Sequence, residues 1–94
     1  MNLTLEYNKK LEIPQFTAAT CKKTSQTESV LTVQNHSANL DVTFSLSPDP
    51  KGKGLYTIKA NNYQPTYFQN NWNGDQLKIS NISGEAVSLL VYLT

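Results

Sequence analysis

The sequence contains no arginine, and all eight basic residues among its 94 are lysines. Arginine supplies the forked donors that bind phosphates and guanine edges in a bidentate manner, so its absence argues against specific nucleic-acid recognition. Charge of either sign is sparse, since charged residues make up 16% of the chain and the formal net charge is +1. We therefore expect a polar, nearly neutral surface and no specific nucleic-acid partner.

Cysteine is also scarce, with Cys21 as the single copy. One thiol cannot close an intrachain disulfide, so the fold must rest on its hydrophobic core, which suits folding in a reducing cytoplasm. For Cys21 itself the context favours a small buried hydrophobe over a reactive thiol. Because no basic start leads into a long apolar run, we expect neither a signal peptide nor a membrane anchor.

Residues suited to catalysis or metal binding are few and scattered. His36 is the only histidine, and Ser37 and Asp41 lie near it in sequence. In a catalytic triad the nucleophile, its base and the orienting acid converge on a pocket from separate elements, and three residues around one turn cannot adopt that geometry. The acidic residues are dispersed and lack the spacing of metal ligands. We expect a protein that is not an enzyme and that holds no metal or cofactor.

Three triplets match the pattern of N-glycosylation acceptors. They begin at Asn2, Asn35 and Asn81. A chain rich in Asn, Ser and Thr produces such matches by chance, and without a secretory route they do not indicate glycosylation.

The chain does contain apolar residues that recur at every second position. In the last third, residues 77–79 and 87–93 show this alternation on either side of the small turn residues 83–85. A period of two places one side of each segment on a buried sheet face. The turn residues between the two segments predict a β-hairpin.

Similar alternation predicts further short strands. Residues 16–29 show only one poorly defined strand and a loop, and residues 47–54 are dense in breakers and predict an exposed loop. No segment has apolar residues three and four apart between capping residues, so we expect no helix longer than a turn. The other strands are expected at 3–7, 11–13, 30–34, 40–46, 56–60 and 66–69.

About seven short strands predict a single domain over residues 1–94, an all-β antiparallel two-layer β-sandwich. The order of elements resembles immunoglobulin-like (Ig-like) domains. Residues 31–46 are similar to the early hairpin of microbial Ig-like domains, with a strand ending in Gln-Asn, a polar turn and an alternating strand with an aromatic residue. Residues 74–93 resemble their closing hairpin. The disulfide pair and central tryptophan of many such domains are missing, because Cys21 is alone and Trp72 falls in a predicted loop.

Aromatic rings and side-chain amides gather between residues 61 and 75. Rings supply apolar area and amides supply directional hydrogen bonds, as a sugar-stacking platform or a protein-docking patch requires. The alternative is that most of the rings close the open end of the sandwich, with Trp72 the ring most expected to be exposed. The candidate binding residues are Tyr63, Tyr67, Phe68, Asn70, Asn71 and Trp72.

In fold, size and composition the chain also resembles the Ig-like accessory and decoration proteins of tailed-phage virions. These proteins are made in the host bacterial cytoplasm and dock on a capsid or tail lattice. The resemblance implies a non-enzymatic virion protein, such as an auxiliary capsid protein, whose partner is a major capsid protein or another virion protein. The ring-rich segment leaves open a carbohydrate-binding module or adhesion domain with a glycan partner. Neither the virion role nor the carbohydrate-binding role involves a membrane.

Overall fold

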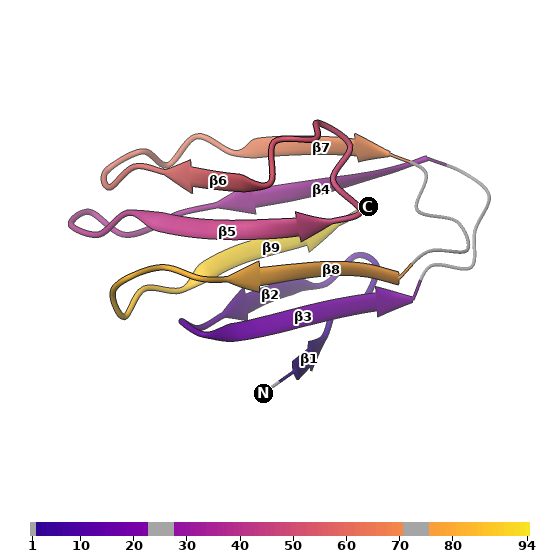
Figure 1. Cartoon of the computed structure of the whole chain (residues 1–94), viewed down its shortest axis with the longest axis horizontal. Helices are drawn as coiled ribbons and strands as arrows, with labels where there is room; N and C mark the ends of the chain where they lie inside the picture. Colours follow the sequence, from indigo (N-terminus) through magenta and orange to yellow (C-terminus); the bar gives the residue numbers. More distant parts are fainter. Residues whose placement is uncertain (1, 23–27, 71–75) are drawn as a thin grey trace.

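The computed structural model describes residues 2–22, 28–70 and 76–94. Within these ranges the chain forms nine strands and no helix, arranged as two stacked sheets (Figure 1). One sheet has five strands in the order β1-β3-β8-β5-β6, and the other has four in the order β2-β9-β4-β7. The strands are β1 (Asn2–Thr4), β2 (Lys10–Ile13), β3 (Thr17–Lys22), β4 (Ser29–Gln34), β5 (Val42–Ser47), β6 (Leu55–Ile58), β7 (Thr66–Asn70), β8 (Gln76–Asn81) and β9 (Leu89–Leu93).

The hydrophobic core lies between the two sheets. Along β4, β5 and β9, buried side chains alternate with more exposed ones, as a period of two requires. Fully buried side chains come from both layers, among them Phe44 and Ile79 in the five-stranded sheet and Leu31 and Val91 in the four-stranded sheet. The predicted all-β two-layer sandwich is therefore confirmed.

Strand β3 forms in the segment where the sequence pattern is weakest. It pairs with β8 along its whole length, and Ala19 and Cys21 are buried. Burial raises the pKa of the Cys21 thiol, which keeps the thiol in its neutral form. Cys21 is thus a small core residue, as predicted.

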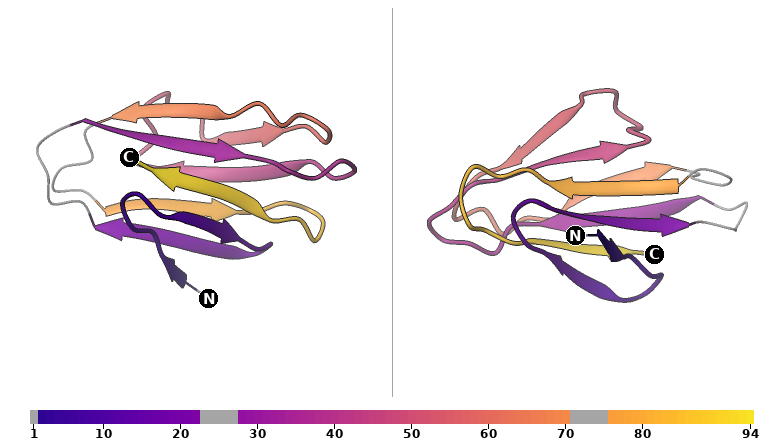
Figure 2. Two further views of the ribbon diagram at one scale, coloured as in Figure 1. Left: turned by 180° about the vertical axis from the view of Figure 1, so that it is seen from behind. Right: turned by 60° about the horizontal axis from the view of Figure 1, so that its bottom comes forward.

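Both predicted hairpins are wrong. Strand β8 belongs to the five-stranded sheet and β9 to the four-stranded sheet, so residues 82–88 carry the chain from one layer to the other (Figure 2). Residues 35–41 make the same kind of connection between β4 and β5. Among the described strands, consecutive strands pair as a hairpin only at β5 and β6. Alternating burial shows which side of a strand is buried, but it carries no information about which strand lies beside it.

The first predicted strand, residues 3–7, is divided between the two sheets. Strand β1 pairs with β3 in parallel, Leu5 is buried, and Tyr7 forms a parallel bridge with Leu93 in the other sheet. Asn8, with a φ of 63°, then reverses the chain into β2, which runs antiparallel to β9. The described part of the chain therefore has nine strands, where about seven were predicted, and the pairing of β1 with β3 is a parallel one within the otherwise antiparallel five-stranded sheet.

Two other predicted strands are too long at one end. The strand predicted at 40–46 begins at Val42, and Leu40 is only partly buried in the connection before it. The strand predicted at 56–60 ends at Ile58. In both cases a neighbouring apolar residue continues the alternation beyond the point where strand pairing stops.

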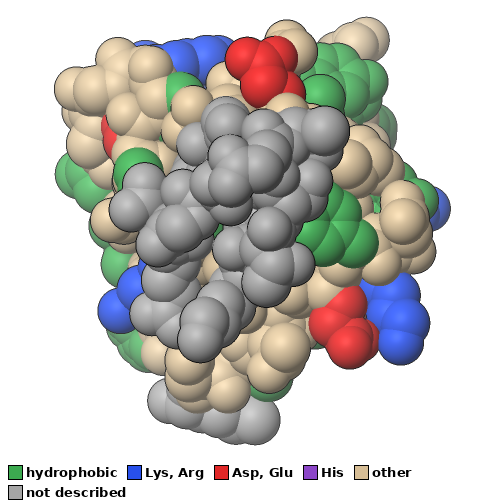
Figure 3. All heavy atoms as spheres, turned by 90° about the vertical axis from the view of Figure 1, so that its right-hand side faces the viewer, with side chains coloured by type: hydrophobic (Ala, Val, Ile, Leu, Met, Phe, Trp, Pro, Cys, Tyr) green, Lys and Arg blue, Asp and Glu red, His purple; other side chains and the backbone are tan. Residues whose placement is uncertain are grey.

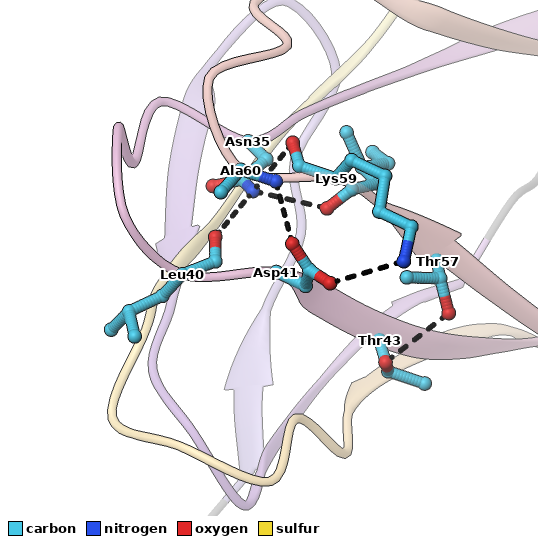
Figure 4. Close-up of polar contacts among 8 residues, drawn as sticks. Asn35, Leu40, Asp41, Thr43, Thr57, Lys59 and Ala60 are labelled. Atoms are coloured by element: carbon cyan, nitrogen blue, oxygen red, sulfur yellow. Dashed lines mark hydrogen bonds and ion pairs between the residues drawn. The ribbon is translucent and has the colours of Figure 1, made fainter.

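A buried asparagine holds the connection between β4 and β5. The Nδ2 of Asn35 donates to the carbonyl oxygens of Leu40, Ile58 and Lys59 at 2.9, 3.1 and 3.3 Å. Its Oδ1 accepts from the backbone N–H of Ser37 at 2.9 Å. Figure 4 shows this amide at the place where the connection meets the end of β6. The side chain thereby supplies hydrogen bonds that the backbone cannot make at a corner between sheets.

A second asparagine does the same between β8 and β9. The Nδ2 of Asn81 donates to the carbonyl oxygens of Ile13 and Val87, each at 2.8 Å. Its Oδ1 accepts from the backbone N–H of Ser83 at 3.1 Å and from the Ser83 hydroxyl at 2.6 Å. The Ser83 Oγ in turn accepts from the N–H of Thr43 at 2.9 Å. Two of the glycosylation-like triplets, at Asn35 and Asn81, therefore lie in connections between the sheets, where the asparagine side-chain amide is buried and hydrogen-bonded.

Asp49 organises the loop between β5 and β6. Its carboxylate accepts hydrogen bonds from the Tyr56 hydroxyl and from the backbone N–H groups of Lys51 and Gly54, the latter two at 2.9 and 2.8 Å. The bond from Tyr56, together with the backbone donors, lowers the pKa of Asp49 to about 2. Burial and the bond to Asp49 raise the pKa of Tyr56 to about 12.

The lowered pKa of Asp49 predicts an acid-sensitive loop. Because the ionised carboxylate is favoured in the folded state, its contribution to stability is complete above the reference pKa of 3.8 and is lost as pH falls through about 2. The free energy of unfolding, measured by urea titration at several pH values, should therefore decline across this window. Asp49→Asn should flatten the decline. Glu85→Gln, at an exposed carboxylate, should retain it, and an equal decline in Asp49→Asn would contradict the assignment.

Candidate functional site

The six candidate binding residues do not form one surface. Tyr63 and Tyr67 are exposed, with 48% and 57% of their surface accessible, whereas Phe68 is fully buried. Asn70 is half-buried at the end of β7. The two remaining candidates, Asn71 and Trp72, lie outside the described residues.

Phe68 is a core residue and is not available to a ligand. Its ring lies edge-on to Phe44 and to Tyr56, with centroid separations of 6.0 and 4.9 Å. Lys51 covers it from the β5–β6 loop, with Nζ 4.7 Å from the ring centroid. For this ring, packing between the sheets replaces the surface role considered from the sequence.

Tyr67 instead stands on the outer side of the four-stranded sheet. The strand register places Tyr67 beside Thr32, Thr32 beside Tyr92, and Tyr92 beside Lys10. Because strands are about 4.8 Å apart, the two tyrosines lie about 10 Å apart with Thr32 between them. This row of residues, together with its neighbours along the same strands, is called the outer face below.

The next row of the outer face combines amide, apolar and acidic side chains. Leu90 lies between Gln34 on β4 and Glu12 on β2. Leu90 and Gln34 are half-buried and Glu12 is exposed. On the other side of the tyrosine row, the half-buried Val30 lies beside Gln69. Apolar and amide groups thus occupy the middle strands β9 and β4 of the face. Its charged residues stand at the margins, with Lys10 and Glu12 on the edge strand β2 and Glu28 just before β4, where its carboxylate accepts a hydrogen bond from the Gln69 side chain at 2.9 Å.

Sequence reasoning missed Tyr92 and Leu90. The buried side chains of β9 are Leu89, Val91 and Leu93, so the alternation predicts that positions 90 and 92 face outward. Polar residues are expected at such positions in a sheet with one wet face, and here they are leucine and tyrosine. Apolar residues at outward positions were the available signal of this partly apolar face.

A depression lies at one end of the outer face. It has a volume of about 160 Å³ and is lined by Glu12, His36, Ser37, Val87, Ser88 and Leu90. Its apolar residues include the buried Val87, whereas Glu12, His36 and Ser88 are exposed. The depression therefore offers apolar contact together with a carboxylate, an imidazole and hydroxyl groups.

The ring of Tyr63 extends this region. It lies edge-on to His36 with centroids 6.3 Å apart, and the Tyr63 carbonyl accepts a hydrogen bond from the Gln34 side chain at 3.4 Å. Tyr63 and Tyr67 thus belong to the same side of the molecule as the outer face and the depression. His36 stands exposed in the connection between β4 and β5.

The outer side of the five-stranded sheet differs in composition. Its outward positions include Thr20, Ser45, Ser80 and Lys78, and the hydroxyls of Thr43 and Thr57 lie 3.3 Å apart. Leu55, 55% exposed, is a large apolar residue on that side. Phe16 and Ile82, at the end of the β3–β8 pair where the Phe16 N–H donates to the Asn81 carbonyl, are exposed as well. This face provides matched control positions because it lacks the tyrosines of the opposite sheet.

Charged groups are dispersed over the surface. Figure 3, which views the right-hand end of the molecule in Figure 1, shows acidic and basic side chains as a few separate groups among polar atoms. Among the described residues, no three His, Cys, Asp or Glu side chains are grouped as a metal site requires. In the same residues there is no helix with the length and apolar character needed to cross a membrane.

Comparisons with known proteins identify the fold. No family model and no curated protein matches the chain. Among solved structures, the pre-peptidase C-terminal domain of a collagenase from Bacillus anthracis aligns with a TM-score of 0.60, covering 100% of this chain and 95% of that chain. The chain shares its fold. At 12% identity, the likeness is restricted to the β-sandwich architecture.

Proposed function

We propose that this protein is a non-enzymatic accessory that binds its partner through the outer face of the four-stranded sheet. The observation that carries the proposal is the arrangement of that face. Tyr92, Leu90 and Val30 occupy the two middle strands and Tyr67 stands on the edge strand β7. The charged residues Lys10, Glu12 and Glu28 stand at the margins. Protein interfaces have the same organisation, with tyrosine enriched and charge depleted at the centre.

The partner we propose is a shell protein of a tailed-phage virion, which makes the chain a decoration or auxiliary capsid protein located in the virion. The small size and near-neutral charge of the domain support this role. A half-buried apolar centre is suited to repeated docking on a regular lattice, since each copy needs only one modest contact surface. Exposed Tyr67 then serves as an anchor residue.

Co-sedimentation with phage particles assembled without this protein tests the role. We expect the full chain to sediment with the particles, and Tyr67→Ala with Tyr92→Ala to reduce binding at least tenfold, as loss of anchoring tyrosines does at other interfaces. Thr57→Ala and Leu55→Ala, on the opposite sheet, are the controls and should bind normally. If the wild-type chain remains in the supernatant, or if the control variants lose binding equally, the proposal is wrong.

A second candidate function is carbohydrate binding. It is favoured by the depression, which places a carboxylate and hydroxyls beside apolar side chains next to the tyrosine row. Sugars present both hydroxyls and apolar C–H faces, so such mixed surfaces suit them. A glycan array tests this candidate. Glycan binding that is weakened by Tyr67→Ala supports carbohydrate binding, and the absence of binding to any glycan on the array contradicts it.

A further inference from the structure

The depression and the tyrosine row lie next to each other on the outer face, and together they define a ligand of a particular shape. Leu90 lines the depression. In β9, Leu90 and Tyr92 are the outward positions on either side of the buried Val91. The two outward positions of one strand are separated by about 7 Å, since each residue rises about 3.4 Å. A ligand seated in the depression therefore continues directly over Tyr92.

We propose that the depression is a subsite for one neutral pyranose unit of an oligosaccharide that extends across Tyr92 and Thr32 toward Tyr67; this inference rests on the carbohydrate-binding candidate above. The volume of about 160 Å³ equals that of about five water molecules, which restricts the subsite to a single sugar unit. The remaining units lie on the open face.

Each lining group has a role in holding a sugar. The Glu12 carboxylate accepts hydrogen bonds from two adjacent hydroxyls, and such charge-assisted bonds are stronger than neutral ones. Leu90 and Val87 contact the apolar face of the ring, and Ser88 adds a hydroxyl that can donate or accept. His36 closes one side, and its ring is positioned by edge-on contact with Tyr63.

The charge of the site defines the sugar class. Glu12 is the acidic residue that lines the depression, and a uronic or sialic acid carboxylate placed beside it meets like-charge repulsion. Neutral hexoses and their N-acetyl derivatives carry hydroxyls without that charge. The depression therefore selects a neutral sugar unit over an acidic one.

The tyrosine row sets the length of the ligand. Tyr92 and Tyr67 are two strands apart and both face outward, so a chain of sugars that crosses the strands contacts both rings. Thr32 between them is small and leaves room for the chain, and Gln34 and Gln69 flank the path with amides. A tetrasaccharide is long enough to fill the depression and to contact both tyrosines.

Amide chemical-shift titration of the ¹⁵N-labelled full chain tests the site. The neutral probes are cellotetraose, maltotetraose, mannotetraose and chitotetraose, and the acidic probe is tetragalacturonate. We expect at least one neutral tetrasaccharide to shift the amides of Glu12, His36, Ser88 and Tyr92, and tetragalacturonate to shift none of them. Glu12→Gln should weaken that binding about tenfold, which corresponds to the loss of charge-assisted bonds. Thr57→Ala, on the opposite sheet, should leave it unchanged.

The alternative outcomes separate this inference from the proposals on which it rests. If the glycan array is positive but shifts are confined to residues 61–75, or if tetragalacturonate binds as well as the neutral probes, the subsite is wrong and carbohydrate binding stands. If no probe binds and the array is flat, both are wrong. If Glu12→Gln instead reduces sedimentation with phage particles while no probe binds, the depression belongs to a protein interface.

Discussion

Replacing Asn81 with alanine is expected to lower the free energy of unfolding by about 3 to 5 kcal/mol. The side-chain amide is fully buried and donates to the carbonyls of Ile13, the last residue of β2, and of Val87, in the connection before β9. Without it, both carbonyls and the Ser83 hydroxyl lose a partner in a place that water cannot easily reach. Each buried group left unsatisfied costs about 1 to 3 kcal/mol. Urea unfolding followed by far-ultraviolet circular dichroism measures the change.

Two further variants make this result specific. Asn81→Asp replaces the donor with an acceptor that faces two carbonyl oxygens, so it should be at least as destabilising as alanine. Asn39→Ala removes an exposed asparagine from a connection between the sheets and should change stability by no more than about 0.5 kcal/mol. A loss below about 1 kcal/mol in Asn81→Ala would show that the amide does not hold the corner.

Replacing Phe68 with alanine is expected to lower the free energy of unfolding by about 4 kcal/mol. Phe68 joins the two layers, because it comes from β7 and packs against Phe44 and Tyr56 of the opposite sheet. Alanine removes these contacts, leaves a cavity, and takes away the ring that faces the Lys51 ammonium. Urea unfolding measures the loss, and Phe68→Leu, which keeps most of the volume, should recover the larger part of it.

The neighbouring Tyr67 provides a control of opposite orientation. Tyr67 points outward from the same strand, so Tyr67→Ala should reduce stability by less than about 1 kcal/mol. Binding of the partner or glycan should instead be impaired by Tyr67→Ala, although this variant remains folded. Equal stability losses at the two positions would contradict the assignment of Phe68 to the core.

Alternating burial was predictable from the sequence, whereas the sheet that each strand joins was not. Leu89, Val91 and Leu93 face the core as their spacing requires. The segments around Asn35 and Asn81 look like hairpin turns because Asn and Ser favour turns. Their folded structures depend on bonds to distant residues, such as the one from Asn81 to Ile13. A local pattern does not contain that information.

The candidate site was predictable only in part. The ring-rich segment drew attention to Tyr63 and Tyr67, and both are exposed. Phe68 was grouped with them by sequence proximity, although adjacent residues of a strand face opposite sides. Glu12 and Leu90 are far apart in the chain, and only the pairing of β2 with β9 brings them together.

The order in which the chain visits its two layers has a consequence for folding kinetics. The first four strands alternate, with β1 and β3 in one layer and β2 and β4 in the other, so an N-terminal fragment holds two incomplete layers and no complete sheet. Most stabilising contacts join residues distant in sequence, and high contact order slows folding to milliseconds or longer. We therefore expect the chain to acquire its structure late and in one concerted step, after synthesis has released the last strand.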